Sequence, residues 1–198
     1  MPQVVAILCS DLHFSDKAPS SRDGCDWYHL QEQVIGEIRD LSLKYGVPVI
    51  CAGDVFHTTD CSPRLINMVL RCMPNLIAIP GQHDLPLHRY DQITESAYWT
   101  LVLCGKIRNL EVGKPIREGM LRIWGFPWGS ELVPNRGGAP GIIDVAVIHR
   151  YVWIEGCGYI GASESGKVYN FDRGSRGYKV VVSGDNHKHF SYRMEGCT

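Results

Sequence analysis

Three short apolar runs, separated by two segments of helical pattern, limit the folds open to this chain. The runs are VVAILCSD (4–11), VPVICAGD (47–54) and LIAIPGQHD (76–84), and each ends in polar residues. Segments 27–46 and 62–73 lie between them and predict helices. A strand–helix alternation of this kind is typical of an α/β sheet with buried parallel strands. We therefore expect an α/β fold.

The helices are predicted from periodicity and from signals at their ends. Four apolar residues of segment 27–46 fall on one helical face: Leu30, Val34, Ile38 and Leu41. Gly46 follows them and can end the helix. In segment 62–73, Ser62 stands at the cap position and Pro63 in the first turn, where its missing N–H costs nothing.

The second half of the chain has a different sequence pattern. Strand-like runs separated by Gly turns occupy 107–112, 121–128, 142–150 and 178–194, the last as strand, loop and strand. Segments 129–141 and 155–177 are rich in Gly and Ser and predict loops. Because neither an internal repeat nor a linker is evident, we expect one domain over residues 1–198, without a separate cap domain.

Charge and hydropathy exclude some classes of protein. The 198 residues include 20 Lys and Arg against 21 Asp and Glu, so the net charge of −1 creates no general attraction for nucleic acid or anionic membrane. No apolar stretch approaches the roughly 20 residues that span a bilayer. The first apolar run is too short for a signal peptide and has no basic segment before it. We expect an intracellular, cytoplasmic protein without membrane contact.

The eight cysteines favour reduced structural thiols. Cys9, Cys51, Cys72 and Cys104 sit in or beside apolar runs, where a free thiol acts as a small hydrophobe. No CxxC pair is present, so a zinc ribbon or a thioredoxin-like motif is disfavoured. A disulfide framework would be unusual in a chain of this length without a secretion signal.

Two phosphate-binding patterns occur in the glycine-rich loop and are rejected. GCGYIG (156–161) fits GxGxxG, and GASESGK (161–167) fits the start of a Walker A loop. Both motifs function only between a strand and a helix N-terminus. Val168 replaces the Ser or Thr that would hold magnesium, and the residues after it predict no helix.

Polar side chains instead gather where the predicted strands end. They are Asp11 and His13, Asp54 and His57, Gln82 to Asp84, His149, and His187 with His189. Taken alone, each would be a cap, a turn or a surface residue, as we expect for His29 and His88. Together they point to one edge of the sheet, where ligands bind in α/β proteins. Mixed imidazole and carboxylate ligands suit manganese, iron or zinc, and their number suggests two metals sharing a carboxylate.

The ordered set D-x-H, G-D, G-x-H-D, H and G-x-x-H-x-H, from Asp11 to His189, resembles the calcineurin-like metallophosphoesterases. Within that superfamily, GDVFHTTDCSP (53–63) and RDGCDW (22–27) resemble the bacterial SbcD-type nucleases that resect DNA ends. The resemblance implies a four-layer αββα sandwich of two mixed sheets with helices outside. It also implies a dinuclear metal centre at one end of the sandwich.

The resemblance implies a role for each matching residue. Asp11, His13 and His189 would bind one metal ion, Asp54 would bridge, and Gln82, His149 and His187 would complete the second site. The metals, expected to be Mn²⁺ with Fe or Zn as alternatives, would clamp the phosphate and activate a bridging water. His83 would protonate the leaving oxygen, and Asp84 would orient His83. His57 and Arg150 are expected to contact substrate.

The chain departs from the family pattern at three places. Gln82 stands where the family usually has Asn, which offers the same carbonyl oxygen on a side chain one methylene shorter. Asp185 stands in GDNHKH where many relatives have GH. The sequence stops nine residues after His189, where relatives continue through another strand.

Two substrate classes, and one non-catalytic alternative, follow from these features. A DNA nuclease is favoured by GDVFH, by the basic residues Arg89, Arg150 and Lys188, and by Tyr151 and Trp153, which could stack on bases. A phosphatase or small-molecule phosphodiesterase fits the nearly neutral charge better. The non-catalytic alternative is a metal-stabilised scaffold for an ATPase partner, and the nuclease resemblance also makes an ATPase a possible partner.

Overall fold

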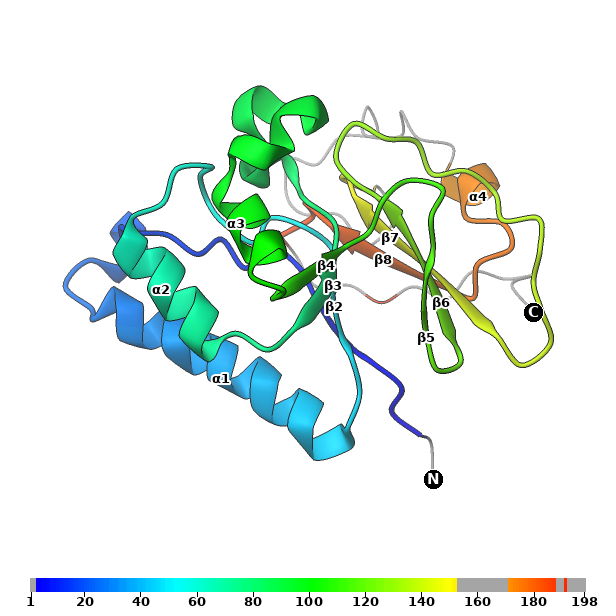
Figure 1. Ribbon diagram of the computed structural model, residues 1–198, viewed down its shortest axis with the longest axis horizontal. Coiled ribbons are helices and arrows are strands. Elements are labelled where there is room, and N and C mark those ends of the chain that lie inside the picture. Colours follow the sequence, from blue (N-terminus) through cyan, green and yellow to red (C-terminus); the bar gives the residue numbers. More distant parts are fainter. Residues whose placement is uncertain (1–2, 153–170, 188–190, 192–198) are drawn as a thin grey trace.

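Two four-stranded sheets form the centre of the computed structural model, which describes residues 3–152, 171–187 and 191 (Figure 1). The first sheet has the order β1-β2-β3-β4, and its strands are all parallel. These strands are β1 (Ile7–Cys9), β2 (Val49–Cys51), β3 (Leu76–Ala78) and β4 (Ile107–Asn109). The helix-containing connections between them are the crossovers that parallel strands require.

The second sheet has the order β5-β6-β7-β8. Strand β5 pairs antiparallel with β6, whereas β6, β7 and β8 are parallel neighbours. Their bounds are β5 (Ile116–Glu118), β6 (Leu121–Phe126), β7 (Ile143–His149) and β8 (Val180–Gly184). The predicted strand at 178–194 is thus described as β8 and the loop after it, while any later strand lies outside the described residues.

Helices cover the outer face of the first sheet (Figure 1). They are α1 (Trp27–Tyr45), α2 (Pro63–Cys72) and α3 (Ala97–Leu103). The predicted ends of the first two are confirmed: Ser62 accepts a hydrogen bond from the Leu65 amide, and Gly46 ends α1 at φ 63°. Helix α3 was not predicted, although Ser96 caps it in the same way as Ser62 caps α2.

The predicted buried face of α1 is confirmed at Ile38, which packs against the core, and is wrong at Val34 and Leu41. Gln31 and Ile35 are buried, whereas Val34 is 50% and Leu41 is 42% exposed. Gln31 is drawn inward because its side chain both accepts from the Ser15 amide and donates to the Ser15 carbonyl. A polar residue therefore takes the position that the hydrophobic periodicity assigned to a neighbouring leucine.

The core has layers, because side chains along each strand alternate between its two faces. One cluster joins the helices to the outer face of the first sheet and includes Ile35, Leu65, Cys51 and Leu101. A second cluster lies between the sheets and includes Ile50, Ile77, Ile123, Val145 and Val147. A third packs Leu132, Val152 and Tyr178 on the far face of the second sheet. The predicted αββα layering is confirmed, with the difference that the described strands of the first sheet are not mixed.

Short helical segments occupy parts of one predicted strand and one predicted loop. The strand predicted over 76–84 ends at Ala78, and Gln82–Asp84 forms a 3₁₀ helix instead. Within the predicted loop 155–177, Phe171–Gly174 forms the helix α4. Two more 3₁₀ helices, Pro86–His88 and Tyr90–Glu95, lead from this region into α3.

Two further sequence expectations concern cysteines and membranes. The six cysteines within the described residues are all free thiols, as expected. Within the same residues, none of the helices is both long and apolar enough to cross a bilayer.

Candidate metal centre

The polar strand ends from both sheets meet at one edge, and Asp54 lies at their centre. Its carboxylate is fully buried. Oδ1 accepts a hydrogen bond of 3.0 Å from the His83 amide, whereas Oδ2 has no hydrogen-bond partner. That oxygen lies 3.6 Å from Nε2 of His13 and 3.3 Å from Nε2 of His149. Asp54 therefore presents one oxygen without a hydrogen-bond partner between two imidazoles.

One group of ligand-type side chains, here called the first side, consists of Asp11, His13 and His187. Nε2 of His13 lies 3.3 Å from Nε2 of His187, which is 3.7 Å from Oδ1 of Asp11. Together with Asp54, these side chains have ligand atoms that all lie within 4.8 Å of one another. Two imidazoles and two carboxylates at this spacing can enclose one divalent cation.

His187 was expected with Gln82 and His149 and instead lies on the first side. The sequence assigned that place to His189, which is outside the described residues. Among the described residues, the second histidine of the first side is therefore His187.

The loop after β8 explains the position of His187. The Asn186 amide pairs with the main chain of Val152, accepting 3.0 Å from its N–H and donating 2.9 Å to its carbonyl. The Asp185 amide donates to both carboxylate oxygens of Asp11, at 3.0 and 3.3 Å. These contacts fasten the loop to the ends of β7 and β1, so His187 is held beside Asp11.

The second side of Asp54 consists of Gln82 and His149. Nδ1 of His149 lies 2.5 Å from the Ala52 carbonyl, which can only accept, so Nδ1 carries the proton. Nε2 then faces Asp54 and is buried without a hydrogen-bond partner. Gln82 donates 2.8 Å from Nε2 to Asp185, and its carbonyl oxygen is likewise buried without a partner.

Glycines make room for this arrangement. A Cβ on Gly53 would lie 2.3 Å from Nδ1 of His149, and one on Gly184 would lie 2.5 Å from the same atom. A Cβ on Gly81 would lie 2.1 Å from Oδ1 of Asp54. The glycines that precede Asp54, Gln82 and Asp185 are therefore required by close packing around Asp54 and His149.

The backbone is strained where the ligands stand. Four ligand-type residues have positive φ: Asp11 at 53°, His13 at 47°, Asp54 at 51° and His187 at 49°. Residues other than glycine rarely adopt this left-handed conformation, and such strain concentrates at functional sites. The positive φ values also explain why β1 and β2 end before Asp11 and Asp54, whereas the strands predicted over 4–11 and 47–54 included these two residues.

Burial and their mutual charges shift the pKa values of Asp54 and of the two histidines beside it. Burial lowers the pKa of His13 to about 4, although the nearby carboxylate of Asp54 acts to raise it. The imidazole of His13 is therefore neutral and can act as a metal ligand. Burial alone would raise the pKa of Asp54, but the adjacent His149 lowers it below its ordinary value. Burial likewise opposes the charge on His149, yet Asp54 raises its pKa to about 9.

His83 and His57 form a stacked pair next to the first side. Their ring centroids are 5.2 Å apart with an interplanar angle of 15°. Nδ1 of His83 lies 2.9 Å from the His57 carbonyl, so it donates there and leaves Nε2 available. Nδ1 of His57 lies 3.4 Å from Nδ1 of His13, and the three histidines have ligand atoms within 4.8 Å.

Asp84 does not orient His83, in contrast to the expectation. Its buried carboxylate accepts hydrogen bonds from the amides of Val55, Phe56 and Gly81, at 3.1, 2.9 and 3.0 Å. Burial raises the pKa of Asp84 to about 7 despite these three donors. The side chain thus links the loop after β2 to the loop after β3, while a main-chain carbonyl orients His83.

Two residues in this region were not assigned a role from the sequence. Asp185 contacts both Gln82 and Asp11, as described above. His88, expected to be a surface residue, is exposed, and its Nδ1 lies 2.9 Å from the main-chain carbonyl oxygen of Gln82. The only sequence signal for Asp185 was that GDNHKH (184–189) differs from the family pattern at this position. No sequence signal indicated a role for His88. His29 is exposed, as expected.

The expected substrate contacts are only partly described. Arg150 directs Nη2 to the Ser130 carbonyl at 3.1 Å. Tyr151 is half-buried at the end of β7. Trp153 and Lys188 lie outside the described residues.

The donor set fits divalent cations. The three buried side-chain atoms Oδ2 of Asp54, Oε1 of Gln82 and Nε2 of His149 have no hydrogen-bond partner, yet buried polar atoms are rarely left unpaired. Each is an atom type that ligates metal. A cation on the second side would pair all three, and one on the first side would share Asp54.

Comparison with protein families gives a match to the calcineurin-like phosphoesterases over residues 5–189. A search of curated proteins found no match. Because the family match covers most of the chain, the chain belongs to the calcineurin-like phosphoesterase family. This family is one of metal-dependent hydrolases that act on phosphate esters.

Proposed function

We propose that this calcineurin-like phosphoesterase hydrolyses phosphodiester bonds, with one divalent cation on each side of Asp54. The observation that carries the proposal is the buried Oδ2 of Asp54, which has no hydrogen-bond partner and lies between the imidazoles of His13 and His149. A buried carboxylate oxygen at this position is suited to ligands shared between two cations, because one acceptor can serve both.

The cation-binding residues follow from the two sides. Asp11, His13 and His187 would hold the first cation, Gln82 and His149 the second, and Asp54 both. The bound cations would neutralise the phosphate and lower the pKa of a water molecule between them. The mixed nitrogen and oxygen ligands favour Mn²⁺, with iron and zinc as alternatives.

The chain's own residues orient the substrate and the proton donor. His83 keeps Nδ1–H on the His57 carbonyl, so its Nε2 can donate a proton to the leaving oxygen only when the ring is charged. His57 stacks on His83 and fixes the plane of that ring. Asp84 holds the loop that carries His83 through its three main-chain hydrogen bonds.

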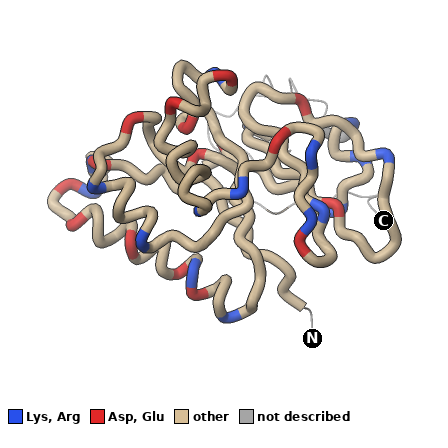
Figure 2. The backbone as a smooth tube through the Cα atoms, viewed as in Figure 1, with Lys and Arg blue, Asp and Glu red and all other residues tan. Residues whose placement is uncertain are grey.

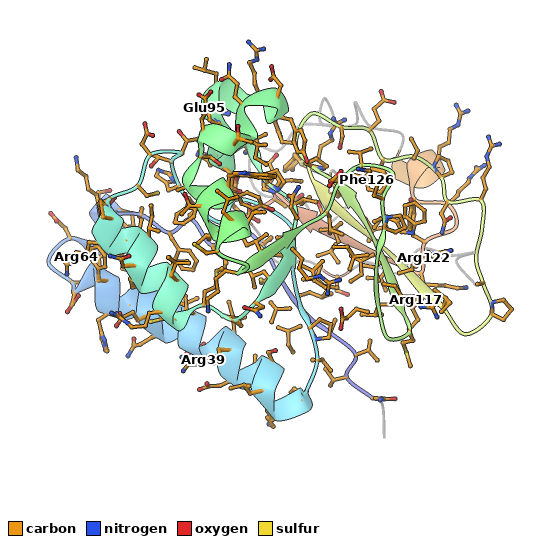
Figure 3. All side chains as sticks on the ribbon, in the orientation of Figure 1. Arg39, Arg64, Glu95, Arg117, Arg122 and Phe126 are labelled. Carbon is orange, nitrogen blue, oxygen red and sulfur yellow. The ribbon has the colours of Figure 1, made fainter. Side chains whose placement is uncertain are left out.

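DNA is the proposed substrate, and the distribution of charge supports it. Residues 1–100 contain 7 Lys and Arg against 12 Asp and Glu, whereas residues 101–198 contain 13 against 9. Basic residues accordingly colour the second-sheet half of the molecule in Figure 2, with Arg117 and Arg122 labelled there in Figure 3. A half of the molecule with an excess of basic residues would attract a polyanionic backbone. We also propose an ATPase partner, and this part of the proposal rests only on the resemblance to the nucleases.

A small-molecule phosphodiester or phosphomonoester is the second candidate. The net charge of −1 favours it, because a protein with this balance gains little from long-range attraction to DNA. The cation-binding residues would be the same for either substrate.

The test is hydrolysis by the purified chain, with Mn²⁺ added, of end-labelled linear duplex DNA beside a generic phosphodiester and a phosphomonoester. Degradation of the DNA that is lost with EDTA would support the nuclease. Turnover of the small esters alone would move the substrate to the second candidate. An absence of all three activities from a chain loaded with Mn²⁺ would contradict the catalytic proposal.

A further inference from the structure

We propose that the far face of the second sheet binds the phosphate backbone of duplex DNA, at a place separate from the metal centre. The inference rests on the proposed function and deepens it, because DNA is the proposed substrate. Figure 3 labels two of the side chains concerned on the second-sheet half of the molecule. The full set, here called the basic face, consists of Arg117, Arg122, Arg136, Arg176 and Lys179.

The pairing of β5 with β6 brings the first two of these cations together. In this antiparallel pair, Arg117 lies directly opposite Arg122. Their neighbours Ile116 and Ile123 pack in the cluster between the two sheets. Because side chains alternate along a strand, the two arginines project from the far face of the sheet.

Asp144 and Lys179 continue the row across β7 and to the start of β8. Asp144 lies opposite Arg122 and accepts hydrogen bonds from its Nε and Nη2 at 2.5 and 2.8 Å. The Lys179 amide donates 2.9 Å to the Asp144 carbonyl, and Val181, two residues later, packs in the cluster on the far face. Lys179 therefore lies on the same face. Since strands are about 4.8 Å apart, the row from Arg117 to Lys179 spans roughly 14 Å.

Two loops bring the remaining arginines to this row. The Asn135 amide donates 3.0 Å to the Arg176 carbonyl, so Arg136 and Arg176 stand on neighbouring segments. Arg122 donates through Nη2 to the Gly137 carbonyl, which ties the loop that carries Arg136 to β6. The five cations thus belong to one region of the surface, although they come from four separate segments of the chain.

Four of the five cations have no acidic partner within the described part of the chain. Arg122 is the exception, because the buried carboxylate of Asp144 neutralises it. The other four side chains are exposed, and none of them forms an ion pair with a described residue. Their charges leave a positive potential that an external anion can neutralise. Several arginines elsewhere on the surface are paired, namely Arg71 with Glu32, Arg89 with Asp91 and Arg108 with Glu118.

The chemistry of the basic face favours a phosphate backbone over a protein partner. Arginine predominates, and its planar guanidinium can donate two parallel hydrogen bonds to one phosphate. Protein-binding surfaces are enriched in aromatic side chains at their centre, whereas Phe126 and Tyr178 of this face are buried. Duplex DNA carries about one negative charge per 1.7 Å of its axis, so one duplex can meet several of these cations.

The basic face lies well away from the metal centre. Asp144 stands near the beginning of β7 (Ile143–His149) and His149 at its end, which separates them by roughly 16 Å along the strand. This length corresponds to about five base-pair steps of a duplex. A duplex held on the basic face would therefore contact the protein several steps from the phosphate that is cut. Binding to this face requires no cation at the metal centre.

The test is fluorescence anisotropy of a labelled linear DNA duplex, titrated with the chain in EDTA at several KCl concentrations. We compare the wild type with a triple variant, Arg117→Gln, Arg136→Gln and Arg176→Gln; Arg122 is kept because it neutralises Asp144. The triple variant should raise Kd at least about 10-fold at about 0.1 M KCl. It should also lower the slope of log Kd against log[KCl] by about 2 to 3, since each phosphate contact contributes about 0.9. Arg117→Gln alone should lower the slope by about 0.9.

A second triple variant controls for net charge. Arg39→Gln, Lys44→Gln and Arg71→Gln remove the same number of positive charges from exposed positions of α1 and α2. These positions lie on the helices that cover the first sheet, so salt screening should keep Kd within about 2-fold of the wild type. Circular dichroism checks the fold of both triple variants.

Three results would each overturn the basic face: absence of duplex binding by the wild type, equal losses in the two triple variants, or salt slopes that Arg117→Gln and the first triple variant leave unchanged. Hydrolysis of a generic small phosphodiester with Mn²⁺ is measured in parallel, and the first triple variant should retain the wild-type rate within about 2-fold. Duplex binding by a wild-type chain that hydrolyses no phosphate ester would instead contradict the proposed function and leave the basic face in place.

Discussion

The two sides of Asp54 differ in burial more than in composition. On the first side, His187 is 60% and His13 is 19% exposed, so water can reach the ligand atoms. On the second side, the His149 side chain is fully buried, and its Nε2 faces Asp54 without a hydrogen-bond partner. Water can therefore substitute for a missing ligand on the first side, whereas the second side has no such substitute. We expect the buried side to be the more sensitive to substitution.

The largest effect is expected where the two sides join. Asp54→Ala removes the oxygen that both cations would share, so hydrolysis of a generic phosphodiester with Mn²⁺ should fall by at least about 10³-fold. The fold should persist, because Asp54 is not part of the three hydrophobic core clusters. Circular dichroism supplies the control for folding. Wild-type rates in this variant would show that neither side depends on Asp54.

Asp84→Ala should instead act on stability. The variant leaves three buried amides without an acceptor, and we expect the free energy of unfolding to fall by roughly 3 kcal/mol, at about 1 kcal/mol for each lost hydrogen bond. Urea denaturation measures this loss. Asp84→Asn keeps one acceptor oxygen and should lose less. Unchanged stability in Asp84→Ala would contradict the structural role assigned to this carboxylate.

His149→Ala and His187→Ala compare the sides directly. Loss of the buried His149 should lower kcat by about 100-fold, and loss of the exposed His187 by about 10-fold, since water can replace the latter. Both rates are measured at saturating Mn²⁺ on a generic phosphodiester. Equal losses would mean that burial does not distinguish the two sides.

Gln82→Asn is expected to have the smallest effect. The shorter side chain keeps a carbonyl oxygen but withdraws it from the second side, so the Mn²⁺ concentration at half-maximal rate should rise a few-fold. Thermal unfolding should be nearly unchanged. Identical manganese titrations of the variant and the wild type would count against Gln82 as a ligand.

The sequence carried most of the information about this edge of the sheet, because parallel strands bring their carboxyl ends together regardless of chain separation. Asp11, Asp54 and His149 could be placed near one another on that basis alone. Their strained φ values and the glycines around His149 could not, because they depend on how closely the two sheets approach.

Contacts made by single side chains were harder to predict. Asp84 follows His83 directly, so the sequence suggested a hydrogen bond between them, whereas the 3₁₀ helix turns the carboxylate toward the amides of Val55 and Phe56. The side to which His187 belongs depends on Asn186 pairing with Val152 across two strand ends. In α1, periodicity could not anticipate that Gln31 would be buried by bonding Ser15.

The central claim is that two cations share Asp54, and electron paramagnetic resonance of the chain loaded with two equivalents of Mn²⁺ tests it most directly. Two ions bridged by one carboxylate are magnetically coupled, so we predict an exchange-coupled spectrum that Asp54→Ala converts to the signal of isolated Mn²⁺. Isolated, uncoupled Mn²⁺ in the wild-type chain at full loading would contradict the shared site.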